Sequence, residues 1–245
     1  MQGPIRSGPY RFQVLTLFPE MIRQAVSHSV LGRAIAAGLI EVRTYDIRDH
    51  TSDRHRTADD EPYGGGPGMV MKVEPVARCL KQVREEAARG TRAFLLSASG
   101  VLFTQEMART FAQEPGLILV CGHYEGVDER VAEHYVDGEI CIGDYVLSGG
   151  EIAALAVLDA VARLLPGVLG NCASLEEESH ARGLVEYPQY TRPAEFEGHR
   201  VPEVLLSGNH AEVRRFREQA AIEKTRRNRP DLFARRAEAT RENRS

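Results

Sequence analysis

The chain has 245 residues, of which 42% are hydrophobic and 27% are charged, and its formal net charge at pH 7 is −4. This length can bury one good core or one larger domain with a small appendage, and the composition argues against intrinsic disorder. The charge is uneven: residues 212–244 hold eleven Arg or Lys against six Asp or Glu, a net of +5 that leaves −9 elsewhere. A basic tail of this kind is either a solvated helical surface or a contact for a polyanion.

The start of the chain shows no targeting signal. Residues 1–10 are expected to form a loose extension, because no apolar run separates a basic start from a small-residue cleavage site. The longest apolar run, residues 152–165, contains two charged residues and is shorter than the roughly 20 residues of a membrane span. The four cysteines form no CxxC pair, which indicates neither a disulfide framework nor a zinc site. We therefore expect a cytoplasmic protein without a membrane anchor.

Five apolar runs of strand length alternate with segments of helical periodicity. The runs are RFQVLTLF (11–18), LIEVRTYDI (39–47), RAFLLSAS (92–99), GLILVCG (116–122) and GEICIGDYVL (138–147). Alternating strands and helices predict an α/β domain with a mainly parallel sheet. Because the runs are apolar almost throughout, we expect helices to cover both faces of the sheet.

Three of these strands end in small residues or glycine, in FLLSASG (94–100), LILVCGHYEG (117–126) and ICIGDYVLSGG (140–150). Ligands of open parallel sheets bind beyond the carboxyl ends of the strands, and glycine lets the main chain approach a ligand closely. One such loop alone would be an ordinary tight turn, whereas three at equivalent places predict a pocket. Ser148 and Glu151 have the spacing of a capping box, which predicts Ser148 as the N-cap of the next helix.

The residue types in these loops indicate the kind of ligand. The chain has no GxxxxGK[ST] motif, and GGGPG at 64–68 lacks the spacing and the preceding strand of a dinucleotide-binding loop. Backbone amides and carbonyls with few cationic side chains suit an uncharged heterocycle such as adenine better than a phosphate.

The pattern changes beyond Pro166 and Gly167, where about 30 residues are polar, broken by prolines and without periodicity. Loops of this length are usually functional or act as linkers. Helical character returns from His210, with Ser207 or Asn209 as the expected N-cap. We expect an α/β body at 1–169, a linker at 170–200 and a small basic helical domain at 201–245.

Five long segments resemble one known family. They are DDEPYGGGPGMVMKVEP (59–75), LILVCGHYEGVDERV (117–131), IGDYVLSGGEIAALAVLDAVARLLPGVLGN (142–171), YTRPAEF (190–196) and VPEVLLSGNHAEVRRFR (201–217). They closely resemble the bacterial tRNA (guanine-N1)-methyltransferases, which modify the guanosine at position 37, 3′ of the anticodon. The resemblance runs from about Phe12 to the Arg-rich tail.

The resemblance implies a fold, an assembly and a methyl donor. The fold is a SPOUT-type α/β domain whose C-terminal part is threaded into a trefoil knot, the assembly is a homodimer, and the donor is S-adenosylmethionine. Periodicity does not predict the knot, because threaded chains are very rare. Carried over residue by residue, the donor pocket comprises Leu95, Leu96, Ser97, Gly122, Tyr124, Glu125, Ile142, Gly143, Asp144, Tyr145, Val146, Leu147, Gly149 and Gly150.

Methyl transfer to N1 of guanine requires a group that removes the N1 proton, and a carboxylate can do so. Negative charge then develops on O6, which a guanidinium can stabilise. The family's base is a linker aspartate at the position of Glu178, so this chain departs from the family by one methylene, and Glu177 or Glu176 could substitute. Arg163 matches the family's guanidinium. The alternatives are a solvated charge run for the glutamates and an i,i+4 ion pair with Asp159 for the arginine.

The resemblance also gives expectations for the RNA substrate. Asp59, Asp60 and Tyr63 are expected to line the target-base pocket, although an ordinary glycine-rich turn explains their loop almost as well. Arg214 and Arg215 are expected to contact RNA phosphates, while a flipped guanine is read in the pocket. His123 receives no chemical role.

Three points stay open at the level of sequence. No metal-ligand cluster is evident, yet a magnesium ion could still take part in the reaction. A SPOUT ribose 2′-O-methyltransferase is a second possible enzyme. A non-catalytic RNA-binding module of the same fold is a third possible function, which the glutamate at position 178 keeps in consideration.

Overall fold

The computed structural model describes residues 8–170, 179 and 183–232 of the chain. The chain divides into two compact units, Met1–Gly170 and Asn171–Ser245. Glu176, Glu177 and Glu178, the candidate bases, lie outside the described residues.

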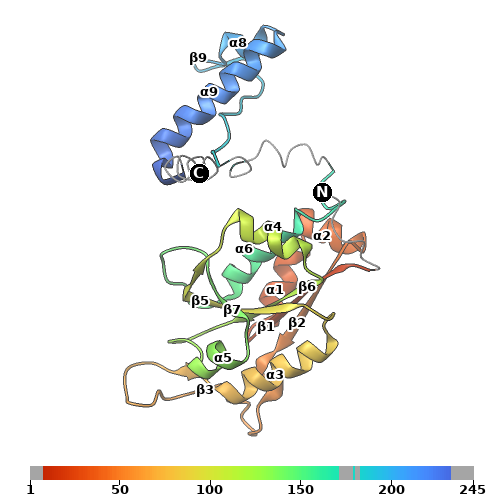
Figure 1. Ribbon diagram of the computed structural model, residues 1–245, viewed down its shortest axis with the longest axis vertical. Coiled ribbons are helices and arrows are strands. Elements are labelled where there is room, and N and C mark those ends of the chain that lie inside the picture. Colours follow the sequence, from red (N-terminus) through yellow and green to blue (C-terminus); the bar gives the residue numbers. More distant parts are fainter. Residues whose placement is uncertain (1–7, 171–178, 180–182, 233–245) are drawn as a thin grey trace, which may run out of the picture. The chain divides into compact units, whose positions relative to one another are not determined.

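The first unit is built on a five-stranded sheet (Figure 1). The strands are β1 (Tyr10–Thr16), β2 (Ile40–Asp46), β5 (Arg92–Leu102), β6 (Gly116–Cys121) and β7 (Gly138–Cys141). Their order is β2-β1-β6-β5-β7, and every neighbouring pair is parallel. The predicted α/β class and parallel sheet are therefore confirmed. The last run was expected to be a longer strand, but β7 stops at Cys141 because the next residues turn into a loop.

Helices cover both faces of this sheet (Figure 1). One face carries α1 (Pro19–Val26), α2 (Ser29–Ala36), α4 (Gln105–Gln113) and α6 (Glu151–Ala162), and the other carries η1 (Ile47–His50), α3 (Val73–Glu86) and α5 (Glu129–His134). Side chains of β6 alternate between the two cores: Leu117 and Leu119 enter the first, and Ile118 and Val120 the second. A strand that is covered on both faces reads as a continuous apolar run, as the sequence predicted.

A short hairpin extends the first unit beside its second face. It consists of β3 (Asp59–Asp60) and β4 (Val70–Met71), and the loop between them projects from the body (Figure 1). The hairpin is tied to the loop after β6, because Met71 N donates to Gly126 O over 2.9 Å and Met71 forms a parallel bridge with Val127.

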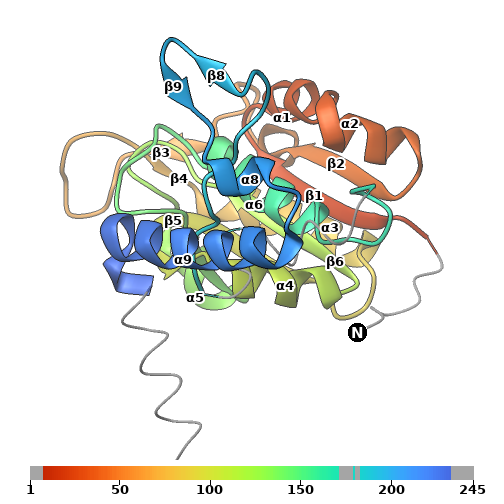
Figure 2. The same cartoon turned by 90° about the horizontal axis from the view of Figure 1, so that it is seen from above.

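The second unit contains one long helix with a short hairpin (Figure 2). Its elements are β8 (Glu195–Phe196), β9 (His199–Arg200), α8 (Glu203–Leu206) and α9 (His210–Asn228). Asn209 is the N-cap of α9, since its side chain accepts from the backbone N–H groups of Ala211 and Glu212. This confirms the second of the two expected caps. Among the described residues of both units, no helix has the length and apolar character needed to cross a membrane.

Candidate functional site

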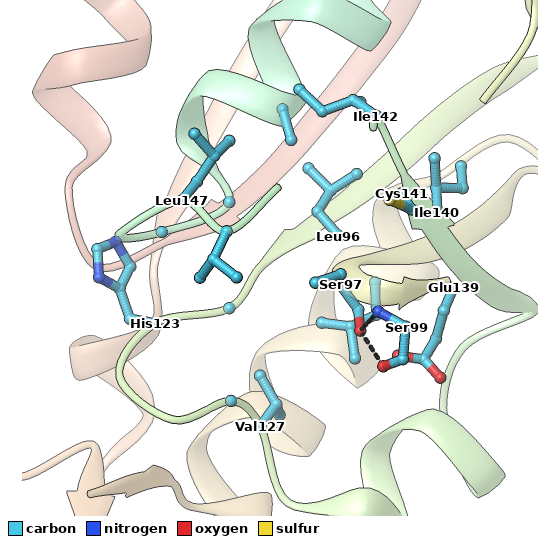
Figure 3. Close-up of a pocket in the computed structure, with 18 of the residues that line it drawn as sticks. Leu96, Ser97, Ser99, His123, Val127, Glu139, Ile140, Cys141, Ile142 and Leu147 are labelled. Atoms are coloured by element: carbon cyan, nitrogen blue, oxygen red, sulfur yellow. Dashed lines mark hydrogen bonds between the residues drawn. The ribbon is translucent and has the colours of Figure 1, made fainter. Parts of the chain in front are cut away.

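A pocket of about 310 Å³ lies beyond the carboxyl ends of β5, β6 and β7. Ligand pockets in proteins typically measure about 300–1,000 Å³, so this one is large enough for a small molecule. Three segments form its walls (Figure 3): residues 95–99 of β5, the loop after β6, and the end of β7 with the loop that leads into α6. This is the place at which parallel sheets bind ligands.

The structure brings together nearly all of the residues that were expected to bind the methyl donor. Those that line the pocket are Leu95, Leu96, Ser97, Gly122, Tyr124, Glu125, Ile142, Gly143, Tyr145, Val146, Leu147, Gly149 and Gly150. Asp144 is the exception, since it lies in the same loop but is not part of the lining. Residues that are more than 50 positions apart in the chain therefore meet at one site.

The first wall of the pocket is a bulge in β5. Leu96 and Val101 both pair with Ile140, so the residues between them leave the ladder. The bulge is closed by a 2.8 Å hydrogen bond between the hydroxyls of Ser97 and Ser99 (Figure 3). A Cβ atom on Gly100 would lie 2.5 Å from the backbone nitrogen of Ile140, so glycine is needed there. Sequence reasoning missed Ser99 as a lining residue, because an apolar run does not reveal a bulge.

The second wall is the loop after β6. Tyr124 has φ 61°, a left-handed conformation that is uncommon for residues other than glycine and often found at functional sites. Glu125 N donates to Met69 O over 3.0 Å, which joins this loop to the hairpin. Asp128 caps α5 by accepting from Arg130 N. The side-chain hydrogen bond from Arg130 also lowers the pKa of the Asp128 carboxyl, so the cap stays ionised in mildly acidic solution.

The third wall leads into α6, and this helix begins differently from the prediction. Gly150 is the N-cap and makes no side-chain hydrogen bond, and Glu151 is the first helical residue, so the predicted capping box of Ser148 and Glu151 is wrong. The Glu151 carboxylate is buried and lies 2.5 Å from Thr16 Oγ1 and 2.7 Å from His123 Nε2. Two side-chain partners in the interior replace the backbone N–H that a capping glutamate would use.

Close backbone contact joins the second and third walls. Gly150 N donates to Gly122 O over 2.8 Å, and His123 forms an antiparallel bridge with Gly149. A Cβ atom on Gly150 would lie 2.7 Å from the Cα atom of Cys121, where no real Cβ atom fits. Glycine at position 150 thus permits the contact that shapes the pocket.

The chemistry of the lining fits S-adenosylmethionine. Leu96, Ile142 and Leu147 provide apolar walls, and the glycines expose main-chain groups that can read a heterocycle (Figure 3). No lysine or arginine occurs among the described residues that line the pocket, whereas Glu125, Glu129 and Glu139 contribute carboxylates. Such a lining does not repel a cationic sulfonium. The residues present therefore suit this donor better than a phosphate-bearing ligand.

The predicted catalytic arginine lies away from the pocket. Arg163 is the C-cap of α6, and its N–H donates to Asp159 O over 3.2 Å. The pocket lies at the other end of this helix, where Gly150 is the N-cap. With a rise of 1.5 Å per residue, the two caps are about 20 Å apart along the axis. The structure does not bring Arg163 to the pocket within one chain.

The remaining candidate residues lie outside the pocket. Asp59 and Asp60 form β3, and Tyr63 is fully exposed in the projecting loop that follows. Arg214 and Arg215 are exposed on α9 in the second unit. Within the part of the chain that the structure describes, no cluster of three or more His, Cys, Asp or Glu could hold a metal ion.

The fold and the site define a parallel α/β protein with a ligand-sized pocket at the carboxyl ends of its strands. Comparison with known proteins gives the family. The chain belongs to the tRNA (guanine-1)-methyltransferase (TrmD) family, whose family model matches residues 10–235.

Its relatives are similar over nearly their whole length. It is 53% identical to a tRNA (guanine-N(1)-)-methyltransferase of Geobacter metallireducens over 223 residues, which is 91% of either chain. A protein of the same name from Methylococcus capsulatus is 55% identical over 91% of this chain and 89% of its own. The one from Chloroflexus aurantiacus is 55% identical over 94% of this chain and 90% of its own.

Proposed function

We propose that this protein transfers a methyl group from S-adenosylmethionine to N1 of the guanosine at position 37 of tRNA. One observation carries the proposal: in a chain of this family, three strand ends converge on a pocket lined by nearly all the expected donor-binding residues. The names of its relatives, tRNA (guanine-N(1)-)-methyltransferases, support methylation of tRNA at N1 of guanine.

The donor pocket would hold and orient S-adenosylmethionine. Leu96, Ile142 and Leu147 would enclose the adenine ring, and main-chain groups of the glycine loops would bind its polar edge. The carboxylate of Glu125 would face the cationic part of the donor. When bound, S-adenosylmethionine supplies an electrophilic methyl group on a positively charged sulfur.

The protein's own acid–base chemistry would act on guanine. We propose that Glu178 accepts the N1 proton, which frees a lone pair for methylation. Arg163 would donate hydrogen bonds to O6 as negative charge develops there. Arg163 comes from outside the pocket, at the far end of α6.

This separation supports a site that a second copy of the chain completes. We propose a homodimer in which the pocket of one protomer meets Arg163 and Glu178 of its partner. Exposed apolar side chains on α1 and α6 support such a contact: Met21 and Ile152 are 44% and 52% exposed. The close contact between the loop after β6 and the loop before α6 supports the trefoil knot that SPOUT domains contain.

The second unit would hold the RNA. We propose residues 170–200 as a linker and 201–245 as a basic tRNA-binding domain, with Arg214 and Arg215 on phosphates. Asp59, Asp60 and Tyr63 would meet the RNA near the target base. A tRNA substrate also supports a cytoplasmic location.

The assigned base can be tested by exchanging one carboxyl group for an amide. Glu178→Gln keeps the size of the side chain but cannot accept the proton, so we expect the single-turnover rate of methylation to fall about 100-fold or more. Glu177→Gln, the matched control, is expected to keep a rate close to that of the wild type. An unchanged rate in Glu178→Gln would show that another group is the base.

A further inference from the structure

A buried side-chain network lies directly behind the pocket. Its central group is the carboxylate of Glu151, which is 2% exposed and contacts Thr16 Oγ1 through one oxygen and His123 Nε2 through the other. Thr16 is also buried, at the end of β1, and its hydroxyl accepts from Phe18 N over 2.8 Å. The network therefore fixes the start of α6 to the last residue of a central strand.

His123 connects this network to the pocket. It lines the cavity, whereas Glu151 does not (Figure 3). Its ring lies against the backbone of Gly149, because a Cβ atom at that position would be 2.0 Å from Nε2. On another side the ring packs against Phe18, with the ring centroids 5.0 Å apart. His123 thus belongs to the second wall, touches the third and is held from behind by Glu151.

We propose that Glu151 is a positioning residue for methyl-donor binding, and that it acts through His123. The pair holds the loop after β6 against the loop before α6, so both walls stand in their binding geometry before the donor arrives. A preformed site binds more tightly because less ordering remains for the ligand to impose. A carboxylate at the first turn of α6 is also favoured by the helix dipole. This inference rests on the proposed function, since it concerns the same pocket.

The network offers an experiment that separates positioning from folding. Binding of S-adenosylhomocysteine to the full chain would be measured by calorimetry for the wild type, Glu151→Ala, His123→Ala and the double variant. We expect each single change to weaken binding about tenfold, which is typical of losing a buried hydrogen bond. The double variant is expected to bind no more weakly than the single ones, because both changes break the same connection.

Two further variants separate a positioning role from a purely structural one. Glu151→Gln keeps hydrogen-bonding groups for Thr16 and His123 and is expected to restore most of the affinity that Glu151→Ala loses. Gln13→Leu removes another buried network, in which the Gln13 amide donates to Tyr45 and Val83 on the other side of the sheet. It is expected to lower the melting temperature and leave the affinity unchanged.

Three results would decide against the inference or against its foundation. Wild-type affinity in Glu151→Ala, with only a lower melting temperature, would make the pair purely structural. Additive losses in the double variant would mean that Glu151 does not act through His123. If the wild-type protein itself failed to bind S-adenosylhomocysteine, the result would contradict the proposed function rather than the role of Glu151.

Discussion

Cys79, in α3, shows how burial controls the chemistry of a single residue. Burial, together with the nearby charges of Asp46, Asp49 and Glu86, raises the pKa of its thiol to about 12. Burial likewise raises the pKa of the Cys121 thiol beneath the pocket, with a further contribution from Glu151. Both thiols therefore stay neutral at physiological pH, and a neutral thiol is a poor nucleophile towards an electrophilic methyl donor.

The raised pKa of Cys79 predicts a loss of stability in alkaline solution. The pKa of Cys79 in the folded protein exceeds its ordinary value of 9.0, so the folded state holds the thiol proton more tightly than the unfolded chain. The resulting contribution to the free energy of unfolding is complete below about pH 9 and is lost as the pH rises towards 12. We expect the melting temperature to fall more steeply between about pH 9 and 11 in the wild type than in Cys79→Ala. Scanning calorimetry over this range would measure it, and parallel curves for the two proteins would refute it.

Glu151 shows where residue-level patterns fail. Its spacing from Ser148 matches a capping box, and the sequence alone contains nothing against that assignment. The deciding partners are distant in the chain: Thr16 ends β1 and His123 lies in the loop after β6. A short-range motif cannot predict which partner the Glu151 carboxylate takes when groups that are distant in the chain compete with the nearby backbone N–H.

At the scale of elements, the strands could be predicted and the bulge could not. The runs around β1 and β6 are largely apolar because both of their faces are covered, so their composition reflects their burial. The bulge in β5 depends on two residues sharing Ile140 as a partner, which no local pattern encodes. β7 ends early because the chain turns directly after Cys141, where Tyr145 N donates to Gly143 O over 2.9 Å.

The N-terminus of α6 gives a prediction at this scale. Gly150→Ala would place a methyl group 2.7 Å from Cys121 Cα and 3.1 Å from Gly122 N, so the helix start and the loop after β6 must move apart. We expect the free energy of unfolding to fall by about 1–3 kcal/mol. Affinity for S-adenosylhomocysteine should also fall at least about tenfold, because the same contact shapes the pocket.

Urea unfolding and calorimetry would measure the two effects of this substitution. Gly170→Ala is the matched control, since a Cβ atom there meets nothing within 4 Å. If Gly150→Ala kept both stability and affinity, the close backbone contact would not be needed for the site.

At the scale of the whole molecule, the uneven distribution of charge bears on RNA binding. A net charge of −4 conceals a C-terminal region of +5, and α9 exposes Arg214 and Arg215. Contacts between basic side chains and phosphates release counterions, so they govern how binding depends on salt. The basic tail alone did not distinguish a solvated helix from an RNA contact, and we propose the RNA contact because the family acts on tRNA.

These two arginines give a prediction for RNA binding. Arg214→Ala/Arg215→Ala should weaken tRNA binding and reduce the slope of log K against log salt by about 2, roughly one for each lost phosphate contact. Affinity for S-adenosylhomocysteine should not change. Filter binding at several salt concentrations would measure the slope. An unchanged slope, or an equal change in Arg33→Ala/Arg109→Ala on exposed surfaces of α2 and α4, would contradict this role.

The order of the strands in the sheet could not be predicted from the sequence, whereas the position of the pocket could. Alternating elements predict parallel strands, and glycine at three strand ends predicts a shared edge. They do not predict that β6 lies between β1 and β5 or that β7 lies at the sheet edge. The separation of Arg163 from the pocket follows from the length of α6, which lies between Gly150 and Arg163.

The most direct test of the account is the identity of the methylated nucleoside. The full chain would be incubated with S-adenosylmethionine and unmodified tRNA transcripts that carry guanosine or adenosine at position 37, and the digested nucleosides analysed by mass spectrometry. We predict 1-methylguanosine from the guanosine transcript only. Formation of 2′-O-methylguanosine, or equal methylation of both transcripts, would contradict the account.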